Sequence, residues 1–379
     1  MIKPFKIEIS KENLQNIYNK VKNYQWHEMP DDGGWEYGTN LEYMKNFSKY
    51  WVEKYDWRKT EANINRFKNF KSNIEGIDIH FIHEKGSGNN PKPLLLSHGW
   101  PGSIVEFLNI IDKLAHPEKY GGSEEDAFDV VVPSLPGFGF SGRPSRPIGP
   151  RKMASILNSL MLNKLGYKKF IAQGGDFGGT ISTWLAYDFP QNLLGIHINI
   201  LITRHPDGPQ TSEEKQWQER FRKEQRIEDG YRTQQATKPQ TLSYAMMDSP
   251  VGVAAWIIEK MRGWSDIKNN DIESVYSKDV LLSNIMVYLV TRTFNTASWI
   301  YYGRREEGGR SLPKEHLPLK VPTAIAIFPK EYLEWAPRSY VERIYNVKQW
   351  TKMAKGGHFA SLEQPELLIN DITKFSKVL

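Results

Sequence analysis

The hexapeptide 174–179, Gly-Gly-Asp-Phe-Gly-Gly, constrains the fold of this chain more than any other stretch. It follows the apolar run 170–172 and precedes a segment of helical character at 180–189. Glycines on both sides let the backbone turn where any Cβ would collide, as in a nucleophile elbow between strand and helix. The central residue is Asp176 instead of serine. Two alternatives stay open here: a helix-capping aspartate, and a phosphate loop, which the carboxylate disfavours by repulsion.

Composition narrows the chemistry of that aspartate. The 379 residues include no cysteine, which excludes a disulfide scaffold, a cysteine nucleophile and a thiolate metal site. A side-chain nucleophile would therefore have to be an oxygen. The net charge of +6 comes from stretches of mixed sign, such as 49–54 and 219–224, which are typical of solvated surface. We therefore predict no nucleic-acid partner.

Apolar strand-like runs alternate with helical segments through much of the chain, which predicts an α/β fold. The strand signals lie at 93–97, 129–132, 170–172 and 195–200, and the helical signals between them at 105–114, 153–165 and 180–189. Such an alternation indicates a mostly parallel central sheet with helices on both faces. After a break, strands return at 323–328 and 348–353, and a helix follows at 365–375.

The break divides the chain into four predicted parts. Residues 203–317 are mainly helical and rich in charge and aromatic rings, as expected of a lid over the carboxyl edge of the sheet, where ligands bind. Residues 86–202 and 318–379 form the two halves of the core. Residues 1–85 form an N-terminal extension that wraps the core, with helices expected at 42–55 and 61–70 and a strand at 77–83.

Two further motifs follow predicted strands. In His98-Gly99-Trp100-Pro101-Gly102, the amide of Trp100 is placed to form an oxyanion hole with the amide of Phe177. We interpret His98 itself as a buried histidine bonded to the backbone. In the second motif, Gly356-Gly357-His358-Phe359, His358 is the predicted general base.

A histidine base needs a carboxylate to orient it. Glu331 directly follows the strand at 323–328 and is the predicted partner, with Glu334 as the competing candidate. Nucleophile, acid and base then occur in the order found in α/β-hydrolases. No Gly-x-Ser-x-Gly is present, which argues against a serine esterase.

Taken together, these motifs resemble those of the microsomal-type epoxide hydrolases, which are α/β-hydrolases with an N-terminal extension. The resemblance covers essentially the whole chain and rests also on segments 51–58 and 77–83 of the extension and 230–231, 237–239 and 248–252 of the lid. It implies the α/β-hydrolase fold, with Asp176 as nucleophile, Glu331 as charge-relay acid and His358 as base.

The resemblance also implies two lid tyrosines that open the epoxide ring. Tyr231 matches a Gly-Tyr motif, and Tyr302 matches a tyrosine shortly after 296–298, with Tyr301 as the alternative register. Trp100, Phe177, Tyr231 and Tyr302 are expected to line the substrate site. Many relatives have tryptophan where this chain has Phe177, a change that we expect to reshape the pocket wall.

The expected activity is conversion of an apolar epoxide and water to a vicinal diol. Asp176 forms an alkyl ester and water activated by His358 hydrolyses it, with no metal or organic cofactor. A small-molecule epoxide is the expected partner, in detoxification or xenobiotic metabolism. The alternatives are a haloalkane dehalogenase, for which tryptophan is the common residue at position 177, and a non-catalytic binding protein on this fold.

The location is predicted from what the chain lacks. Residues 1–6 contain no apolar signal segment, and the longest apolar-rich run, 193–202, has about half the length that a bilayer crossing needs. We therefore expect no integral membrane segment and a cytoplasmic protein. Peripheral membrane contact and a homodimer stay open.

Overall fold

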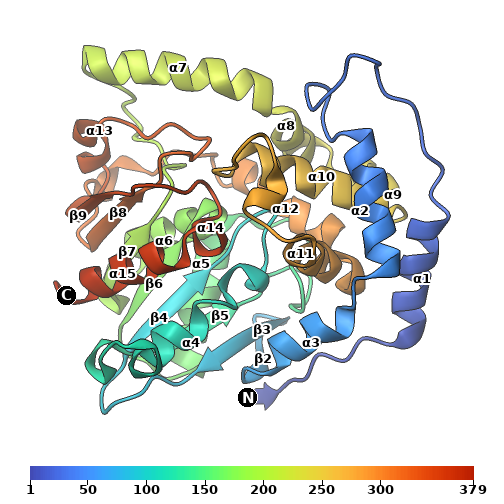
Figure 1. The fold of residues 1–379 in the computed structure, drawn as a ribbon. Coiled ribbons are helices and arrows are strands. Elements are labelled where there is room, and N and C mark those ends of the chain that lie inside the picture. The colour runs from blue at the N-terminus through green and yellow to red at the C-terminus, as the bar shows by residue number, and fades with distance from the viewer.

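The computed structural model describes all 379 residues and contains one nine-stranded sheet (Figure 1). The strand order is β1-β2-β3-β5-β4-β6-β7-β8-β9. Pairing is parallel from β5 to β9 and antiparallel among β1, β2, β3 and β5. The strands are β1 (Ile2–Pro4), β2 (Asn69–Ile74), β3 (Ile77–Glu84), β4 (Lys92–Ser97), β5 (Phe128–Pro133), β6 (Phe170–Gly174), β7 (Leu193–Ile198), β8 (Pro322–Ile327) and β9 (Asn346–Lys352). The predicted α/β fold with a mostly parallel sheet is confirmed.

The central strands are mostly apolar because helices cover the sheet on both faces. Every residue of β5 and β6 is buried. Figure 1 shows α4 and α15 in front of the sheet and α5 and α6 behind it. These helices are α4 (Ile111–Ala115), α5 (Pro150–Ser159), α6 (Asp176–Asp188) and α15 (Pro365–Ser376), and the short α13 (Arg338–Glu342) and α14 (Ala360–Glu363) lie between β8 and α15.

Two predicted helices differ from the structure. The helix expected at 105–114 is a 3₁₀ turn over Ile104–Phe107 followed by the short α4. The helix expected at 61–70 is α3 (Trp57–Asn65), which ends earlier because the side-chain amide of Asn69 donates to the carbonyls of Ile64 and Phe67 at 3.0 and 2.8 Å. The chain then enters β2, in which Phe70 pairs with Phe81 of β3.

The segment between β7 and β8 is helical, as predicted. Its helices lie at the carboxyl ends of the parallel strands, where the backbone amide of His358 bonds to the carbonyl of Trp264 at 2.9 Å. They are α7 (Ser212–Glu228), α8 (Gly230–Thr237), α9 (Pro239–Met246), α10 (Pro250–Gly263), α11 (Lys278–Thr291) and α12 (Phe294–Glu306). We call this segment the lid.

The N-terminal extension contacts the lid as well as the core. Its strands β1 to β3 enlarge the sheet, whereas α1 (Lys11–Lys22) and α2 (Leu41–Glu53) lie beside lid helices at the right of Figure 1. Thr39 donates to the carbonyl of Ala255 at 2.7 Å, and Tyr50 donates to Asp279 at 2.9 Å. The extension therefore ties the lid to the sheet.

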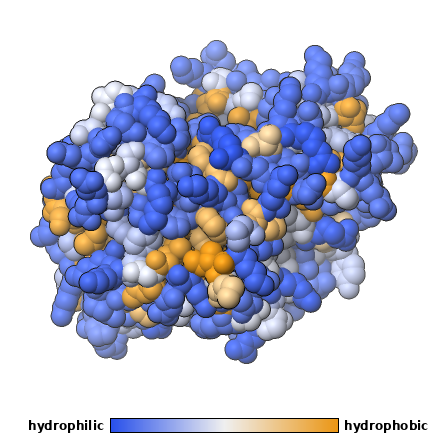
Figure 2. Space-filling model, turned by 90° about the horizontal axis from the view of Figure 1, so that it is seen from below, coloured by the Kyte–Doolittle hydropathy of each residue, from blue (hydrophilic) through white to orange (hydrophobic).

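Extension, core and lid share one hydrophobic interior. A single cluster of 98 buried residues includes Trp51 of the extension, Leu95 of the sheet and Leu282 of the lid. The face in Figure 2 is mostly hydrophilic, with small separate apolar patches. No helix combines the length and the apolar composition that a bilayer crossing requires. The catalytic geometry is thus set by parts that are packed as one body.

Candidate active site

Asp176 lies at a sharp turn between β6 and α6. Its φ is +45°, a conformation that non-glycine residues adopt only under strain, and such strain is common at active sites. A Cβ on Gly178 would lie 1.8 Å from the carbonyl oxygen of Ser97, and one on Gly174 would lie 2.1 Å from the carbonyl carbon of Gly178. The flanking glycines are therefore required by close approach of the backbone, as the motif predicts.

The carboxylate of Asp176 is held by a backbone amide. Its Oδ1 accepts a hydrogen bond of 2.8 Å from the amide of Trp100. The Phe177 amide belongs to the first turn of α6, where amides have no acceptor within the helix. Both amides of the predicted oxyanion hole are thus beside Asp176, and the helix N-terminus favours negative charge there.

His358 and Glu331 form a buried pair behind the carboxylate. The Nδ1 atom of His358 lies 3.0 Å from both carboxylate oxygens of Glu331, and its Nε2 lies 3.7 Å from Oδ2 of Asp176. Their side chains are 2% and 1% exposed. Glu334, the competing candidate, instead pairs with Arg220 at the surface. The gap at Nε2 is too long for a direct bond and suits a base that acts through water.

The charge state of His358 depends on its neighbours. Burial by itself lowers the pKa of this imidazole, but the charge and hydrogen bonds of Glu331, together with the charge of Asp176, raise the pKa to about 9. The resting site therefore holds an imidazolium between two carboxylates.

The loop that carries His358 is fixed by the lid and by a residue that the motifs do not reveal. The amide of His358 donates to the carbonyl of Trp264, and a Cβ on Gly357 would lie only 2.6 Å from that carbonyl. Glu363 accepts from the amides of Gly357 and Phe359 at 2.9 Å each and from that of Asp266 at 2.7 Å. Burial raises the pKa of Glu363 to about 7, although the hydrogen bonds from these three amides act to lower it. In the sequence, the only feature that distinguishes Glu363 is its position five residues after His358.

Two lid tyrosines cover the carboxylate. Tyr231 of α8 stacks on Trp100 with ring centroids 5.2 Å apart. Tyr301 of α12 meets Trp100, Phe177 and Tyr231 edge to face, at 5.6, 4.8 and 5.8 Å. The predicted Tyr302 is absent from this group and Tyr301 occupies it.

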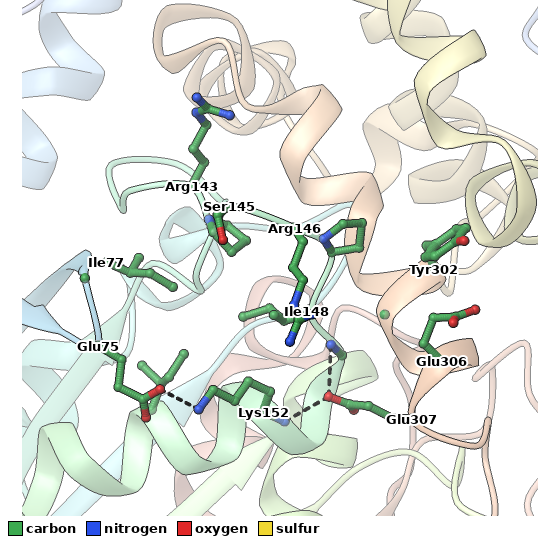
Figure 3. A pocket seen from close by; sticks show the side chains of 16 residues that line it. Glu75, Ile77, Arg143, Ser145, Arg146, Ile148, Lys152, Tyr302, Glu306 and Glu307 are labelled. Atoms are coloured by element: carbon green, nitrogen blue, oxygen red, sulfur yellow. Dashed lines mark hydrogen bonds and ion pairs between the residues drawn. The ribbon is translucent and has the colours of Figure 1, made fainter.

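Tyr302 lies on another side of α12, so the predicted register is corrected by one residue. Together with Arg146 and Glu306, Tyr302 lines a separate cavity of about 1010 Å³. Figure 3 shows these side chains. The guanidinium of Arg305 lies 4.3 Å from the Tyr302 ring. Consecutive residues of a helix point about 100° apart, so only one of two adjacent tyrosines can face the site.

Both inward tyrosines are kept protonated. Burial, followed by the charge of Asp176, raises the pKa of Tyr231 above its usual range, and burial with the neighbouring Tyr231 does the same for the pKa of Tyr301. The Tyr231 hydroxyl lies 3.2 Å from that of Tyr332. The buried Tyr301 hydroxyl has no hydrogen-bond partner, which costs about 1–3 kcal/mol unless a ligand supplies one. An acceptor oxygen on a substrate would satisfy it.

A small cavity is lined by both Asp176 and His358. It measures about 20 Å³, enough for one water molecule, and Trp100 and Glu106 are also among its lining residues. Burial and the charge of Asp176 raise the pKa of Glu106 to about 8, although His358 opposes the shift. A Cβ on Gly102 would lie 1.5 Å from the Glu106 carboxylate. The sequence signal for Glu106 is its position just after the Trp100 motif.

His98 has the structural role predicted for it. Its Nδ1 lies 3.0 Å from the carbonyl of Gly99, and its Nε2 accepts from the amide of Leu135 at 3.2 Å. Burial lowers its pKa to about 4, so the ring is neutral. No three histidine, aspartate or glutamate side chains are placed to share a metal ion.

Comparison with known proteins gives consistent matches along the chain. The family described as Epoxide hydrolase N terminus matches residues 2–107, and the alpha/beta hydrolase fold matches residues 92–247. Epoxide hydrolase 1 of Sus scrofa is 37% identical over 100% of this chain and 89% of its own length. Juvenile hormone epoxide hydrolase 2 of Ctenocephalides felis is 34% identical over 98% of this chain and 84% of its own. The crystal structure of juvenile hormone epoxide hydrolase from the silkworm Bombyx mori superposes with a TM-score of 0.89 at 29% identity, covering 100% of this chain and 95% of that one.

Proposed function

Because this chain belongs to the epoxide hydrolases of the α/β-hydrolase fold, we propose that it opens an apolar epoxide through a covalent ester on Asp176. The observation that carries the proposal is a carboxylate at the elbow, faced by two buried phenols. A carboxylate can attack an epoxide carbon, and phenols can protonate the oxygen that leaves it.

In the first half of the reaction, an Asp176 oxygen attacks one ring carbon and the bond from that carbon to the epoxide oxygen breaks. Tyr231 and Tyr301 donate hydrogen bonds to the emerging alkoxide, and one of them transfers its proton to it. The imidazolium proton of His358 then restores the phenol. The product of this half is a hydroxyalkyl ester next to a neutral imidazole.

Alkylation itself prepares His358 for the second half. Esterification removes the negative charge of Asp176, one of the causes that raise the pKa of His358, so the ring releases its proton more readily. A water in the small cavity gives a proton to Nε2 and attacks the ester carbonyl. The amides of Trp100 and Phe177 stabilise the oxyanion, and its collapse releases the diol and the carboxylate.

The walls of the site favour an apolar substrate. Trp100, Phe177, Tyr231, Tyr301 and Trp264 surround the carboxylate with aromatic faces, and all five are buried. We propose clearance of reactive epoxides as the role. Cytoplasmic location and a homodimer stay predictions.

A single-turnover experiment in oxygen-18 water tests the covalent route. Water attacks the enzyme's carbonyl, so the first turnover should place the label in the peptide that contains Asp176 and leave the diol unlabelled. Label in the diol alone would contradict the ester. Incubation with a chloroalkane is the control for dehalogenase chemistry, and no chloride release is expected.

A further inference from the structure

A third cavity, of about 630 Å³, is lined in part by Tyr301, which also contacts the candidate catalytic site. It lies among α7, α8 and α12, and six of its fourteen lining residues are arginines. They are Arg222, Arg226, Arg232, Arg304, Arg305 and Arg310. Asp229 is the one acidic residue in the wall. We call this space the arginine cavity.

Few of these charges are neutralised. Arg232 pairs with Asp229, and Arg305 pairs with Glu306 at 3.0 Å. Arg310 contacts only the side-chain oxygen of Gln225, at 3.5 Å. The other lining arginines, among them two on α7, have no hydrogen-bonded or ionic partner on their side chains. The wall therefore carries a surplus of positive charge.

Arg304 is the most deeply buried of the arginines that line the cavity. It is 5% exposed, yet its guanidinium has no carboxylate and no hydrogen-bond acceptor. It lies 4.8 Å from the Phe177 ring and 5.5 Å from the Tyr301 ring, between the arginine cavity and the catalytic site. Burial, followed by the charge of Arg310, lowers its pKa to about 10, so it stays charged at neutral pH. A buried charge without a partner is costly, and an anion in the cavity removes that cost.

Nearby groups add to the positive field. Nη2 of Arg204 is buried without a partner, and its guanidinium lies 4.5 Å from the ring of Phe221, a residue of the cavity wall. Burial and then the charge of Arg310 lower the pKa of Arg204 to about 9. A guanidinium binds a carboxylate through two parallel hydrogen bonds, which makes a carboxylate a suitable occupant.

We propose that the arginine cavity binds a carboxylate beside Tyr301, with Arg304 and Arg310 as its principal donors. The catalytic side of Tyr301 is lined by aromatic rings and its other side by arginines, which matches the chemistry of an organic acid with an apolar chain. The carboxylate can belong to the epoxide itself, as in an epoxidised fatty acid, or to a separate organic acid. The first source rests on the proposed epoxide hydrolysis.

The first arm compares a terminal epoxide of undecanoic acid with its methyl ester at fixed ionic strength. The readout is kcat/KM for the acid divided by kcat/KM for the ester. In the wild type we expect a ratio of about 10 or more, carried by a lower KM for the acid, as a charged hydrogen bond supplies. Arg310→Gln, at a half-buried position, should bring the ratio close to 1, and so should Arg304→Met if it folds.

Arg338→Gln is the matched control, since Arg338 is an exposed arginine of α13 paired with Glu342. It should leave both substrates unaffected. A second arm titrates hexanoate into styrene oxide hydrolysis. If the ligand is a separate organic acid, hexanoate should change the rate of styrene oxide hydrolysis saturably in the wild type and not in Arg310→Gln. In that case the kcat/KM ratio of acid to ester in the first arm should be near 1.

The carboxylate site would be overturned if the wild type opens the epoxide of the methyl ester but shows a kcat/KM ratio of acid to ester near 1 and no response to hexanoate. If the wild type opens the epoxide of neither the methyl ester nor styrene oxide, the proposed function itself is contradicted. The two failures are therefore distinguishable in one set of measurements.

Discussion

The two halves of the catalytic site are held in different ways. On the core side, Asp176 is bonded to the Trp100 amide, and His358 is bonded to Glu331 through its ring and to Trp264 through its amide. On the lid side, Tyr301 is positioned by ring packing alone, and its hydroxyl is free. In the proposed mechanism, the core half thus fixes the reacting atoms, whereas the lid half keeps donors available for a substrate oxygen. Substitutions should therefore have large effects in the core and graded effects in the lid.

The largest effect should follow from Asp176→Ala. Without the carboxylate no ester can form, and diol production should fall by about 10⁴-fold or more, the scale seen when a nucleophile is removed. Diol is measured by chromatography, with thermal unfolding to confirm that the variant folds. Diol formation within tenfold of the wild type would show that Asp176 is not the nucleophile.

His358→Gln should separate the two half-reactions. Ring opening by Asp176 can continue but the ester cannot be hydrolysed, so turnover should fall by about 10³-fold. Intact-mass measurement should show an increase equal to the mass of the substrate. The double variant Asp176→Ala/His358→Gln is the control and should show no adduct; an adduct there would place the ester elsewhere.

Glu331→Gln and Glu334→Gln form a matched pair. Burial lowers the pKa of His358, and the Glu331 charge is the main cause that raises it to about 9, so its removal lets the imidazole lose its proton at a lower pH. Turnover should drop by about 10²-fold, and the acid limb of the pH profile should move to lower pH. Glu334→Gln should leave the profile in place. Equal effects from the two variants would remove Glu331 from the proposed triad.

Tyr301→Phe and Tyr302→Phe test the lid half. Loss of the Tyr301 hydroxyl should slow ester formation by about 10- to 100-fold, because one of two donors is removed. Its melting temperature should not fall, since that hydroxyl has no partner in the free protein. Tyr302→Phe should behave as the wild type. Pre-steady-state quenching of tryptophan fluorescence measures the rate of ester formation. A larger loss of this rate in Tyr302→Phe than in Tyr301→Phe would favour Tyr302 as the second ring-opening tyrosine.

The smallest effect is expected from Glu106→Gln. With a pKa of about 8 the Glu106 carboxyl is protonated at neutral pH, and glutamine mimics that form. Above pH 8 the wild type gains a negative charge beside the developing oxyanion, which should slow ester hydrolysis by about two- to threefold. The variant should lack this decline. The same decline in both proteins would assign it to another group.

The sequence motifs of the core half come together in the structure because they reflect hard steric constraints, although their catalytic roles stay predictions. Only glycine fits at positions 174 and 178, where any Cβ would collide with neighbouring backbone atoms. The prediction for the lid half is one residue out of register, because either of two adjacent tyrosines satisfies the same local pattern. Glu106 and Glu363 escape prediction because neither belongs to a motif, and only their positions shortly after the Trp100 and His358 motifs distinguish them. The overextended helix at 61–70 is wrong because the Asn69 side chain caps α3 from a distance of several residues.

The bond between the His358 amide and the Trp264 carbonyl couples the lid to the proposed base. If this corner of the lid shifts, that bond changes, while Glu363 still holds the amides of Gly357 and Phe359 on either side of His358. A substrate that displaces Trp264 therefore acts on the orientation of the imidazole through the main chain, without touching the ring.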